Sequence, residues 1–356
     1  MKTFSHIAFI MLKWILSLVQ LFLLLLAGFL LFIAISDFDP PPAQQLKVSE
    51  AEEAHQSADS SLTLITWNIG YGGLGKEMDF FYDGGQRVRP SLKAHKKYFQ
   101  GITSFIKSHD SIDFFLLQEV DKNAKRSWRT SQTVAIRNKL PAHYSTFSKN
   151  YDVPFVPLPP LNPMGKVEAG MMTFSGIPPE SAVRLALPDV YSWPKKHFML
   201  DRAAIVTTHS LSTGKKLMVI NIHNSAYVDD STALQNELEV IRSYALNAYR
   251  NGFYVIIGGD WNQNPPAYSP EAPPHVALPW EINKNAFGEG WLWAYDTSAV
   301  TNRYLSAPLD DNTKRTTIDY FALSPNIKLK RIRVLPMNFR YSDHEPVYLN
   351  VTLTHH

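Results

Sequence analysis

An uncharged, predominantly apolar run of 22 residues, Trp14–Ile35, constrains this chain more than any other feature. A helix of about 20 apolar residues is long enough to cross a bilayer. Lys2 and Lys13 precede the run, and Asp37 and Asp39 follow it. The positive charge before the run predicts a cytoplasmic N-terminus, with the rest of the chain outside the cytoplasm.

A cleaved signal peptide is the alternative interpretation of this run. The apolar core of a signal peptide usually has about 7–15 residues and precedes a cleavage site of small residues. Ala34-Ile35-Ser36 would serve as such a site. The run is longer than a signal core requires, so we favour an uncleaved single-pass anchor over residues 1–36. Residues 37–60, proline-rich and then polar, predict a linker that holds a domain of residues 61–356 off the membrane.

The composition of the domain excludes several kinds of site. The chain has no cysteine, so disulfides, thiolate metal sites and cysteine nucleophiles are excluded. Oxygen and imidazole ligands remain, which suit Mg²⁺, Mn²⁺, Ca²⁺ or Zn²⁺. Of 35 basic and 32 acidic side chains, two of each flank the apolar run, which leaves 33 and 30 for residues 40–356. Such a nearly neutral domain lacks the basic excess of indiscriminate nucleic-acid binding.

Many apolar runs and only two strong amphipathic patterns follow the linker. Helical spacing predicts helices over Pro90–His109 and Ser231–Arg250. Strands are predicted at 62–67, 113–119, 169–174, 203–208, 217–223, 254–257, 316–323, 329–335 and 347–353. The proline-dense segment 151–165 predicts a loop that walls a cleft, touches the membrane or packs on its own domain. This pattern favours an α/β layered sandwich over a regular barrel.

Polar side chains stand at the ends or edges of the predicted strands. The buried run Tyr254–Ile257 leads directly into Gly258-Gly259-Asp260-Trp261-Asn262, where the glycines would let the backbone approach a ligand. The polar positions of this kind are Asn68, Glu119, Asn221, His223, Asp260, Asn262, Asp319, Asp343 and His344. Strand ends at one sheet edge share a cleft. Carboxylates, histidines and amides there suit divalent-metal phosphoester chemistry.

Six short motifs follow one another along the chain. They are Trp67-Asn68, Gln118-Glu119, Asn221-Ile222-His223, Gly259-Asp260-Trp261-Asn262, Ile318-Asp319-Tyr320 and Ser342-Asp343-His344. In these motifs and their order the chain resembles, over residues 62–353, the endonuclease/exonuclease/phosphatase superfamily. The resemblance implies a four-layer α/β/β/α sandwich like that of deoxyribonuclease I, preceded here by one transmembrane helix. It also implies a metal-dependent phosphoric ester hydrolase.

The resemblance implies a metal site and a site for the attacking water. Glu119 would be the principal Mg²⁺ ligand, with Asn68 and Asp343 nearby. Mn²⁺ or Ca²⁺ would suit the same ligands. Asp260 would orient or deprotonate the water, and Asn262 would hold the phosphate or that water.

Further roles concern the phosphate and its surroundings. His344 would act on the phosphate or as an acid or base, oriented by Asp319. His223 matches a histidine that the deoxyribonuclease and sphingomyelinase branches place near the phosphate, and Asn221 and Arg202 would contact the substrate. Gly70 departs from the Asn-x-Asp pattern of abasic-site endonucleases, which argues against that branch and removes one metal ligand.

Three functions compete on this evidence. The first is a membrane-anchored phosphodiesterase or phosphatase that acts outside the cytoplasm on a lipid or small phosphoester. The second is a membrane-anchored endonuclease that cleaves external DNA or RNA. The third is a binding protein that has lost the chemistry, which six intact motifs disfavour. We expect the enzyme to be a monomer.

Overall fold

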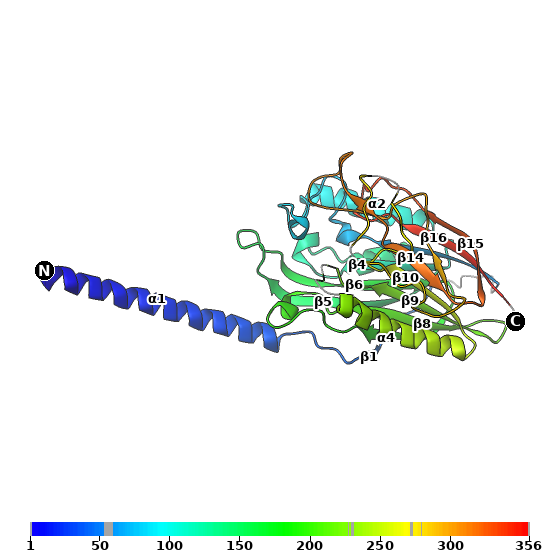
Figure 1. Ribbon diagram of the computed structural model, residues 1–356, viewed down its shortest axis with the longest axis horizontal. Helices are drawn as coiled ribbons and strands as arrows, with labels where there is room; N and C mark the ends of the chain where they lie inside the picture. The colour runs from blue at the N-terminus through cyan, green and yellow to red at the C-terminus, as the bar shows by residue number, and fades with distance from the viewer. Residues whose placement is uncertain are drawn as a thin grey trace.

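The computed structural model describes residues 2–52, 60–226, 228, 231–270, 273–278 and 280–354 (Figure 1). Most strands in this part of the chain belong to two seven-stranded sheets. The first sheet has the spatial order β1 (Ala43–Gln45), β7 (Pro179–Ala186), β8 (Ala203–Ser210), β9 (Lys216–His223), β10 (Tyr254–Asp260), β14 (Asp319–Leu323) and β11 (Leu292–Ala294). The second has the order β15 (Ile327–Val334), β16 (Val347–Leu353), β3 (Ser61–Asn68), β4 (Phe114–Asp121), β6 (Gly165–Ser175), β5 (Tyr144–Val156) and β2 (Val48–Ser49).

The two sheets pack face to face, because apolar side chains on their inner faces form one core. Leu64 and Leu116 of the second sheet meet Val219 and Ile256 of the first in this cluster, and all four are buried. Alternation along each strand places every second side chain in this layer.

Helices cover the two outer faces. On the second sheet, Ile102 and Ile106 of α2 (Leu92–Ser108) pack with strand residues of β3 and β4, and the short helix α3 (Gln132–Arg137) joins them. On the first sheet, Ile241 and Ala245 of α4 (Ser231–Arg250) pack against β9 and β10. The predicted four-layer α/β/β/α sandwich is confirmed, and both predicted helices are present within two residues of their expected ends.

The proline-dense segment 151–165 differs from its prediction. The sequence predicts a loop throughout, whereas β5 continues to Val156 and β6 starts at Gly165. Pro154 is tolerated because the pairing of β5 with β6 skips between Val153 and Val156, so no ladder hydrogen bond is required there. The loop itself is shortened to residues 157–164.

The predicted linker, residues 37–60, also differs from its prediction in the part that the structure describes. Ala43–Gln45 form β1, which pairs with β7 at the edge of the first sheet, and Val48–Ser49 form β2, which pairs with β5. Two short edge strands therefore tie this segment to the domain. Residues 53–59 lie outside the described residues.

The helix α1 (Lys2–Ile35) extends away from the sandwich (Figure 1). An 18-residue stretch within His6–Ile35 has a mean hydropathy of 2.9, and the helix is long and apolar enough to span a membrane. The side chains described along α1 are mostly exposed, but Ile33 near its end is buried against the domain. A helix of spanning length therefore stands at the predicted position.

Candidate active site

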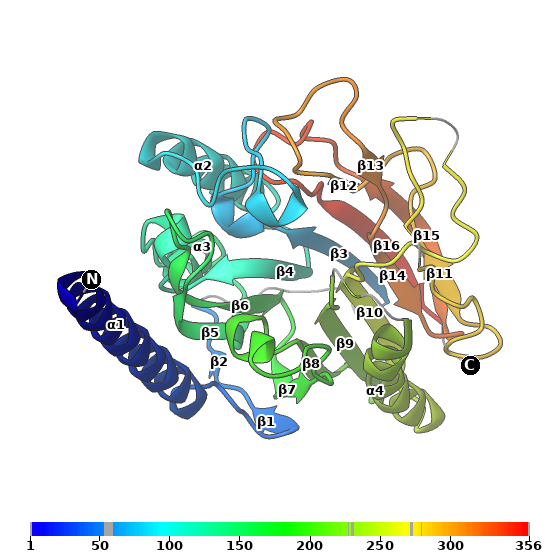
Figure 2. The same ribbon diagram turned by 60° about the vertical axis from the view of Figure 1, so that its left-hand side comes forward.

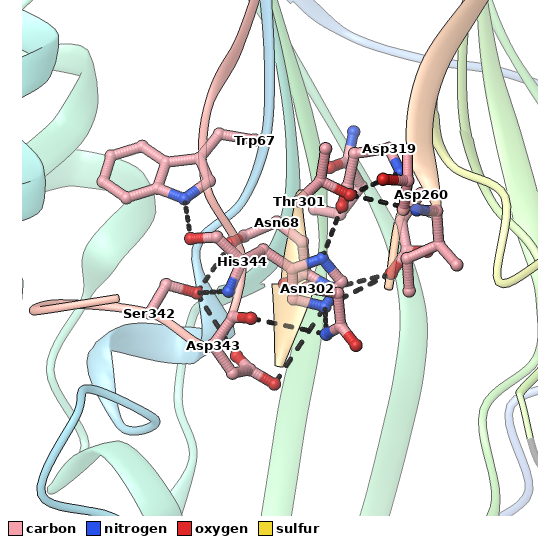
Figure 3. Close-up of polar contacts among 12 residues, drawn as sticks. Trp67, Asn68, Asp260, Thr301, Asn302, Asp319, Ser342, Asp343 and His344 are labelled. Carbon is pink, nitrogen blue, oxygen red and sulfur yellow. Dashed lines mark hydrogen bonds and ion pairs between the residues drawn. The ribbon is translucent and has the colours of Figure 1, made fainter. Parts of the chain in front are cut away.

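The polar strand ends of both sheets meet at one end of the sandwich (Figure 3). Asp260, the last residue of β10, is in register with His223 of β9 on one side and Asp319 of β14 on the other. Asn68 ends β3 in the facing sheet. The loop before β16 brings in Asp343 and His344. Residues scattered over most of the domain sequence therefore form one site.

Asp319 and His344 form a buried pair. Nδ1 of His344 lies 2.8 Å from Oδ2 of Asp319, and both residues are buried. Burial acts to lower the pKa of His344, but the carboxylates of Asp319 and Asp260 outweigh it and raise that pKa well above its ordinary value. The His344 ring is therefore a cation that Asp319 orients.

Asp260 is held by two donors and faces both histidines. Its Oδ2 accepts a hydrogen bond from Nδ2 of Asn68 at 3.0 Å, and its Oδ1 accepts one from the backbone N–H of Asn262 at 2.9 Å. Nε2 of His223 and Nε2 of His344 lie 3.6 and 3.8 Å from Oδ2. Burial raises the pKa of Asp260 to about 6; Asp319 adds to the rise and His344 opposes it. This carboxylate accepts a proton near neutral pH.

Asn68, predicted as a metal ligand, lies in the site with its amide nitrogen toward the carboxylates. Its Oδ1 accepts a hydrogen bond from the backbone N–H of Gly70 at 3.0 Å. The amide nitrogen is thereby turned to Oε1 of Glu119 at 3.1 Å and to Asp260. An amide NH₂ group donates hydrogen bonds and has no lone pair for a metal. Asn68 therefore positions the two carboxylates.

Glu119 reaches the site because β4 bulges. The pairing of β4 with β6 is irregular between Leu117 and Val120, and Glu119 has a φ of 53°. Such left-handed backbone costs free energy in a non-glycine residue and is concentrated at functional sites. The bulge turns the Glu119 side chain, 22% exposed, into the cavity.

Asp343 is the second carboxylate on that side of the cavity. Burial raises the pKa of Asp343 to about 7; Glu119 adds to the rise and His344 and Arg303 oppose it. The absence of a side chain at Gly70 has a local reason, since a Cβ there would lie 2.8 Å from Oδ1 of Asp343. Gly70 therefore makes room for Asp343.

Two sets of side chains in the site have the composition of a divalent-metal site. Asp260, Asp319 and His344 each offer a ligand atom within 4.8 Å of the others. However, His344 carries a proton on each ring nitrogen when it is a cation, and Oδ2 of Asp319 is already paired with it. Glu119 and Asp343 line the cavity, and the proximity of two carboxylates in a buried place favours a cation between them. The donor set therefore fits a divalent cation at Glu119 and Asp343.

His223, Arg202 and Asn262 border the same cavity. Burial, together with the positive charges of Arg202, His344 and Arg126, lowers the pKa of His223 well below its ordinary value. The ring is therefore neutral at pH 7. Nη1 of Arg202 lies 3.5 Å from the backbone oxygen of His223, so its guanidinium is available at the cavity wall. The sequence predicts that these three residues contact the substrate.

Asn221 does not line the cavity, which corrects its predicted contact with substrate. It is fully buried between the sheets, where Oδ1 accepts a hydrogen bond from Gln118 at 2.8 Å and Nδ2 donates to the backbone oxygen of Met172 at 3.0 Å. Its side chain points opposite to that of its neighbour in the strand, as alternation requires. Asn221 joins the two sheets.

The glycines before Asp260 have a packing role in addition to the predicted approach to a ligand. A Cβ on Gly259 would lie 2.1 Å from the backbone oxygen of Ile222, and one on Gly258 would lie 2.4 Å from the ring of Phe321. These glycines permit close packing inside the sandwich.

Two cavity residues escape sequence analysis. Arg126 is buried; its Nη2 donates to Asp121 at 2.9 Å, and its guanidinium lies 3.9 Å from the ring centre of Tyr71. The side-chain amide of Asn302 lies 3.0 Å from Nε2 of His344, and beside a cationic ring the oxygen of that amide must face the Nε2–H group. Asp121 in the apolar strand β4 could have indicated a partner such as Arg126, because a buried carboxylate needs a cation. Asn302 lies in an irregular region that carries no pattern.

The site opens into a cavity of about 340 Å³. Its polar end holds the carboxylates and histidines, and its walls are mainly aromatic and aliphatic, with Tyr82, Tyr151, Tyr191, Met199 and Leu200 among them. An apolar pocket with a few convergent polar groups is the usual form of a small-ligand site.

A model of the family described as "Endonuclease/Exonuclease/phosphatase family" matches residues 65–344 of the chain. This range includes every site residue predicted from the sequence. No curated protein matches the chain.

Solved structures share the fold. The endonuclease/exonuclease/phosphatase from Beutenbergia cavernae DSM 12333 is 17% identical, covers 83% of this chain and 72% of its own, and has a TM-score of 0.54. The protein of the same description from Bacteroides vulgatus is 18% identical, covers 83% of this chain and 99% of its own, and has a TM-score of 0.54. ANGEL2, a 2',3'-cyclic phosphatase in complex with adenosine-2',3'-vanadate, is 14% identical, covers 87% of this chain and 99% of its own, and has a TM-score of 0.55.

Proposed function

We propose a function from the premise that the chain belongs to the endonuclease/exonuclease/phosphatase family, whose members hydrolyse phosphoesters. The protein is a divalent-metal-dependent phosphodiesterase or phosphatase that acts outside the cytoplasm on a lipid or small phosphoester. The observation that carries the proposal is the convergence of Asp260, the Asp319–His344 pair and Glu119 on one cavity. The lysines before the apolar run Trp14–Ile35 and the aspartates after it support the extracytoplasmic placement.

The residues of the site divide the work of hydrolysis. Asp260, with a pKa of about 6, is ionised at neutral pH and takes a proton from the attacking water. His344 as a cation donates a hydrogen bond to the phosphoryl group, and Arg202 adds positive charge from the cavity wall. Asn68 holds Asp260 in place.

Glu119 and Asp343 would hold the divalent cation. A bound Mg²⁺ offsets negative charge on the phosphoryl oxygens. Asn262 lies beside the cavity with a φ of 52°, and its Nδ2 donates to the backbone oxygen of Asn224 at 2.8 Å. That hydrogen bond fixes the Asn262 amide at the cavity wall.

The endonuclease alternative is less well supported. A nuclease without sequence preference draws its affinity from basic side chains, and residues 40–356 hold 33 of them against 30 acidic ones. The mainly apolar cavity suits a compact ligand better than a strand of nucleic acid.

The test uses the full chain in detergent micelles with Mg²⁺ or with EDTA. A chromogenic bis-phosphodiester, plasmid DNA and RNA are offered in parallel. We expect Mg²⁺-dependent turnover of the diester, reduced about 100-fold or more in Glu119→Gln and in His344→Ala. Mg²⁺ should also raise the melting temperature of the wild type and have less effect on Glu119→Gln.

The matched control is Glu239→Gln, an exposed glutamate on α4 that pairs with Arg242. It should keep full activity, because exposed ion pairs contribute little. Turnover that survives in Glu119→Gln or His344→Ala would overturn the proposed site. Cleavage of DNA or RNA alone would favour the nuclease.

A further inference from the structure

We propose that an apolar surface of this domain inserts into the outer leaflet of the bilayer, so that the catalytic cavity opens onto lipid headgroups and the substrate is a membrane phospholipid. This membrane-facing surface consists of Trp128, Phe155, Leu158, Leu161 and Trp193. The inference rests on the proposed function, whose substrate class it names.

The surface is unusually apolar for a part exposed to solvent. Leu161 is fully exposed, Trp193 is 62% exposed, and Leu158 is 45% exposed. In the part of the chain that the structure describes, its members are five of the nine large apolar side chains exposed outside α1. Apolar side chains gathered in this way mark a contact with a partner or a membrane.

The helix α1 fixes the depth of this surface. The ring of Phe29 packs edge to face on Phe155, with ring centres 6.3 Å apart, and stacks on Phe198 at 6.2 Å. A helix needs about 20 residues, at 1.5 Å per residue, to cross the hydrocarbon layer. If the membrane span begins at Trp14, after Lys13, it therefore ends at Ile33.

Phe29 then lies about 6 Å inside the outer boundary of the hydrocarbon layer. Its partners Phe155 and Phe198 share that depth, because their rings touch it. The domain therefore does not stand clear of the membrane; part of it is at the level of the lipid chains.

The rest of the surface continues from these two contacts. Leu158 and Leu161 lie in the loop between β5 and β6, which projects on the side from which α1 leaves the domain (Figure 1). Trp193 lies in the same β7–β8 connection as Phe198. A tryptophan at the bilayer surface is a common anchor, since its ring suits the headgroup region.

Basic side chains border the apolar loop. Arg89 donates from Nη2 to Asn162 in this loop at 3.2 Å, and its guanidinium lies 5.9 Å from the ring centre of Trp128. Lys125 reaches the backbone oxygen of Pro163 at 3.5 Å. Cations beside inserted apolar side chains lie at the level of lipid phosphates, where they are attracted to anionic headgroups.

The elements that bear this surface also wall the catalytic cavity. Tyr151 of β5 and Met164 from the end of the β5–β6 loop line it, and so do Tyr191, Met199 and Leu200 from the β7–β8 connection. The OH of Tyr151 donates to the backbone oxygen of Phe198 at 2.9 Å, which joins the two walls. A phospholipid would therefore enter between them, with its apolar part against the walls and its phosphate at the carboxylates.

The reaction on such a lipid is a hydrolysis that balances without a further reactant. Water adds its oxygen to phosphorus and gives a proton to Asp260. One ester P–O bond breaks, and the leaving oxygen takes up a proton. The products are an alcohol and a phosphate monoester.

The first experiment measures depth, independently of activity. Because the chain has no cysteine, Leu161→Cys gives a single labelling site for an environment-sensitive fluorophore. The matched control is Thr213→Cys, which is exposed in the turn after β8. That strand separates it from the β7–β8 connection by about 26 Å, at 3.3 Å per residue over eight residues.

The full chain is reconstituted in vesicles of phosphatidylcholine, phosphatidylglycerol and sphingomyelin. We expect the label at position 161 to be quenched by lipids with a quencher on the acyl chain and shielded from iodide. The label at position 213 should show the reverse. Equal quenching by iodide at both positions would overturn the proposal.

The second experiment measures substrate class. The double variant Leu158→Asp, Leu161→Asp should lose about tenfold or more of its phosphate release from vesicle phospholipid, because two charged side chains resist insertion. Turnover of a soluble bis-phosphodiester should stay unchanged. Leu292→Asp on β11, where the side chain is about as exposed as that of Leu158, is the control (Figure 2).

The outcomes separate this inference from the function on which it rests. Turnover of the soluble diester without any hydrolysis of vesicle lipid overturns the lipid substrate and leaves the hydrolase proposal intact. Hydrolysis of vesicle lipid at the same rate in wild type and double variant overturns the role of the surface. If neither substrate turns over with Mg²⁺, the proposed function fails, and the lipid substrate fails with it.

Discussion

At the scale of single residues, the site depends on buried charges that hold one another. Asp319 is fully buried, and its nearest polar partner through Oδ2 is His344. The cationic form of His344 in turn depends on Asp319 and Asp260, because burial alone would discharge the ring. The protonation state of His344 therefore depends on the charges of Asp319 and Asp260.

Asp319→Asn tests this dependence. The substitution removes the charge that raises the pKa of His344, so we expect turnover of a soluble phosphodiester to fall about 100-fold or more. The alkaline limb of the pH–rate profile should also move to lower pH, because the ring loses its proton earlier. Kinetics over a range of pH measure both effects.

Asp110→Asn is the control, since Asp110 is exposed and pairs with Lys107 at the end of α2. If the role of Asp319 were merely structural, the turnover rate would fall but the alkaline limb of the pH–rate profile would not move. That result would contradict the assignment of Asp319 as the residue that sets the charge of His344.

At the scale of elements, the start of β14 is positioned by a segment with little regular structure. Oγ of Thr301 accepts hydrogen bonds from the backbone N–H groups of Ile318 and Asp319, both at 3.0 Å. The short strands β12 (Asn302–Arg303) and β13 (Arg315–Thr316) follow, and Asn302 forms a bridge with His344. The irregular region 265–315 thus supports the Asp319–His344 pair.

Thr301→Ala leaves two buried backbone donors without their acceptor. We expect the free energy of unfolding to fall by about 1–3 kcal/mol, with a loss of activity because Asp319 shifts. Thr301→Ser keeps the oxygen and should restore most of both. Denaturant unfolding and diester turnover are measured on the three proteins, and equal losses in Ala and Ser would contradict the hydrogen-bond explanation.

At the scale of the whole molecule, the junction between α1 and the domain contains an acidic cluster. Asp201 lies close to Asp37, just after α1, and to Asp189. Burial raises the pKa of Asp201 to about 7; Asp37 and Asp189 add to the rise, and Arg184 opposes it. The junction is therefore sensitive to pH.

The sign of the effect follows from proton linkage. An unfolded aspartate has a pKa of about 3.9, so between about pH 4 and pH 7 the folded chain holds a proton that the unfolded chain has lost. Stability contributed by Asp201 therefore falls as pH rises through this window. Asp201→Asn removes the ionisation and should stabilise the protein at pH 8 by about 2 kcal/mol.

Unfolding of the full chain in detergent at pH 4 and at pH 8 measures this difference. The variant should match the wild type at pH 4 and exceed it at pH 8. Asp311→Asn, on an exposed turn, should change neither value. A variant that is less stable than the wild type at pH 8 would show that the Asp201 carboxylate is stabilising.

The sequence by itself determined the layered α/β class, the positions of α2 and α4, and most of the residues that meet in the site. These follow from local patterns: the periodicity of apolar side chains, and short motifs in which a polar residue ends a strand. Glu119, Asp260, Asp319 and His344 stand in such motifs, and their convergence follows from strand order.

Only the tertiary structure decided which way several of these side chains face. The amide of Asn68 donates to Asp260, 192 residues away, and Asn221 accepts from Gln118, 103 residues away. The buried position of Arg126 depends on the cavity wall around Tyr71. The packing of Phe29 on Phe155 likewise places the domain beside α1, where the sequence predicts a linker. Contacts between distant segments leave no local pattern, so no window of sequence contains them.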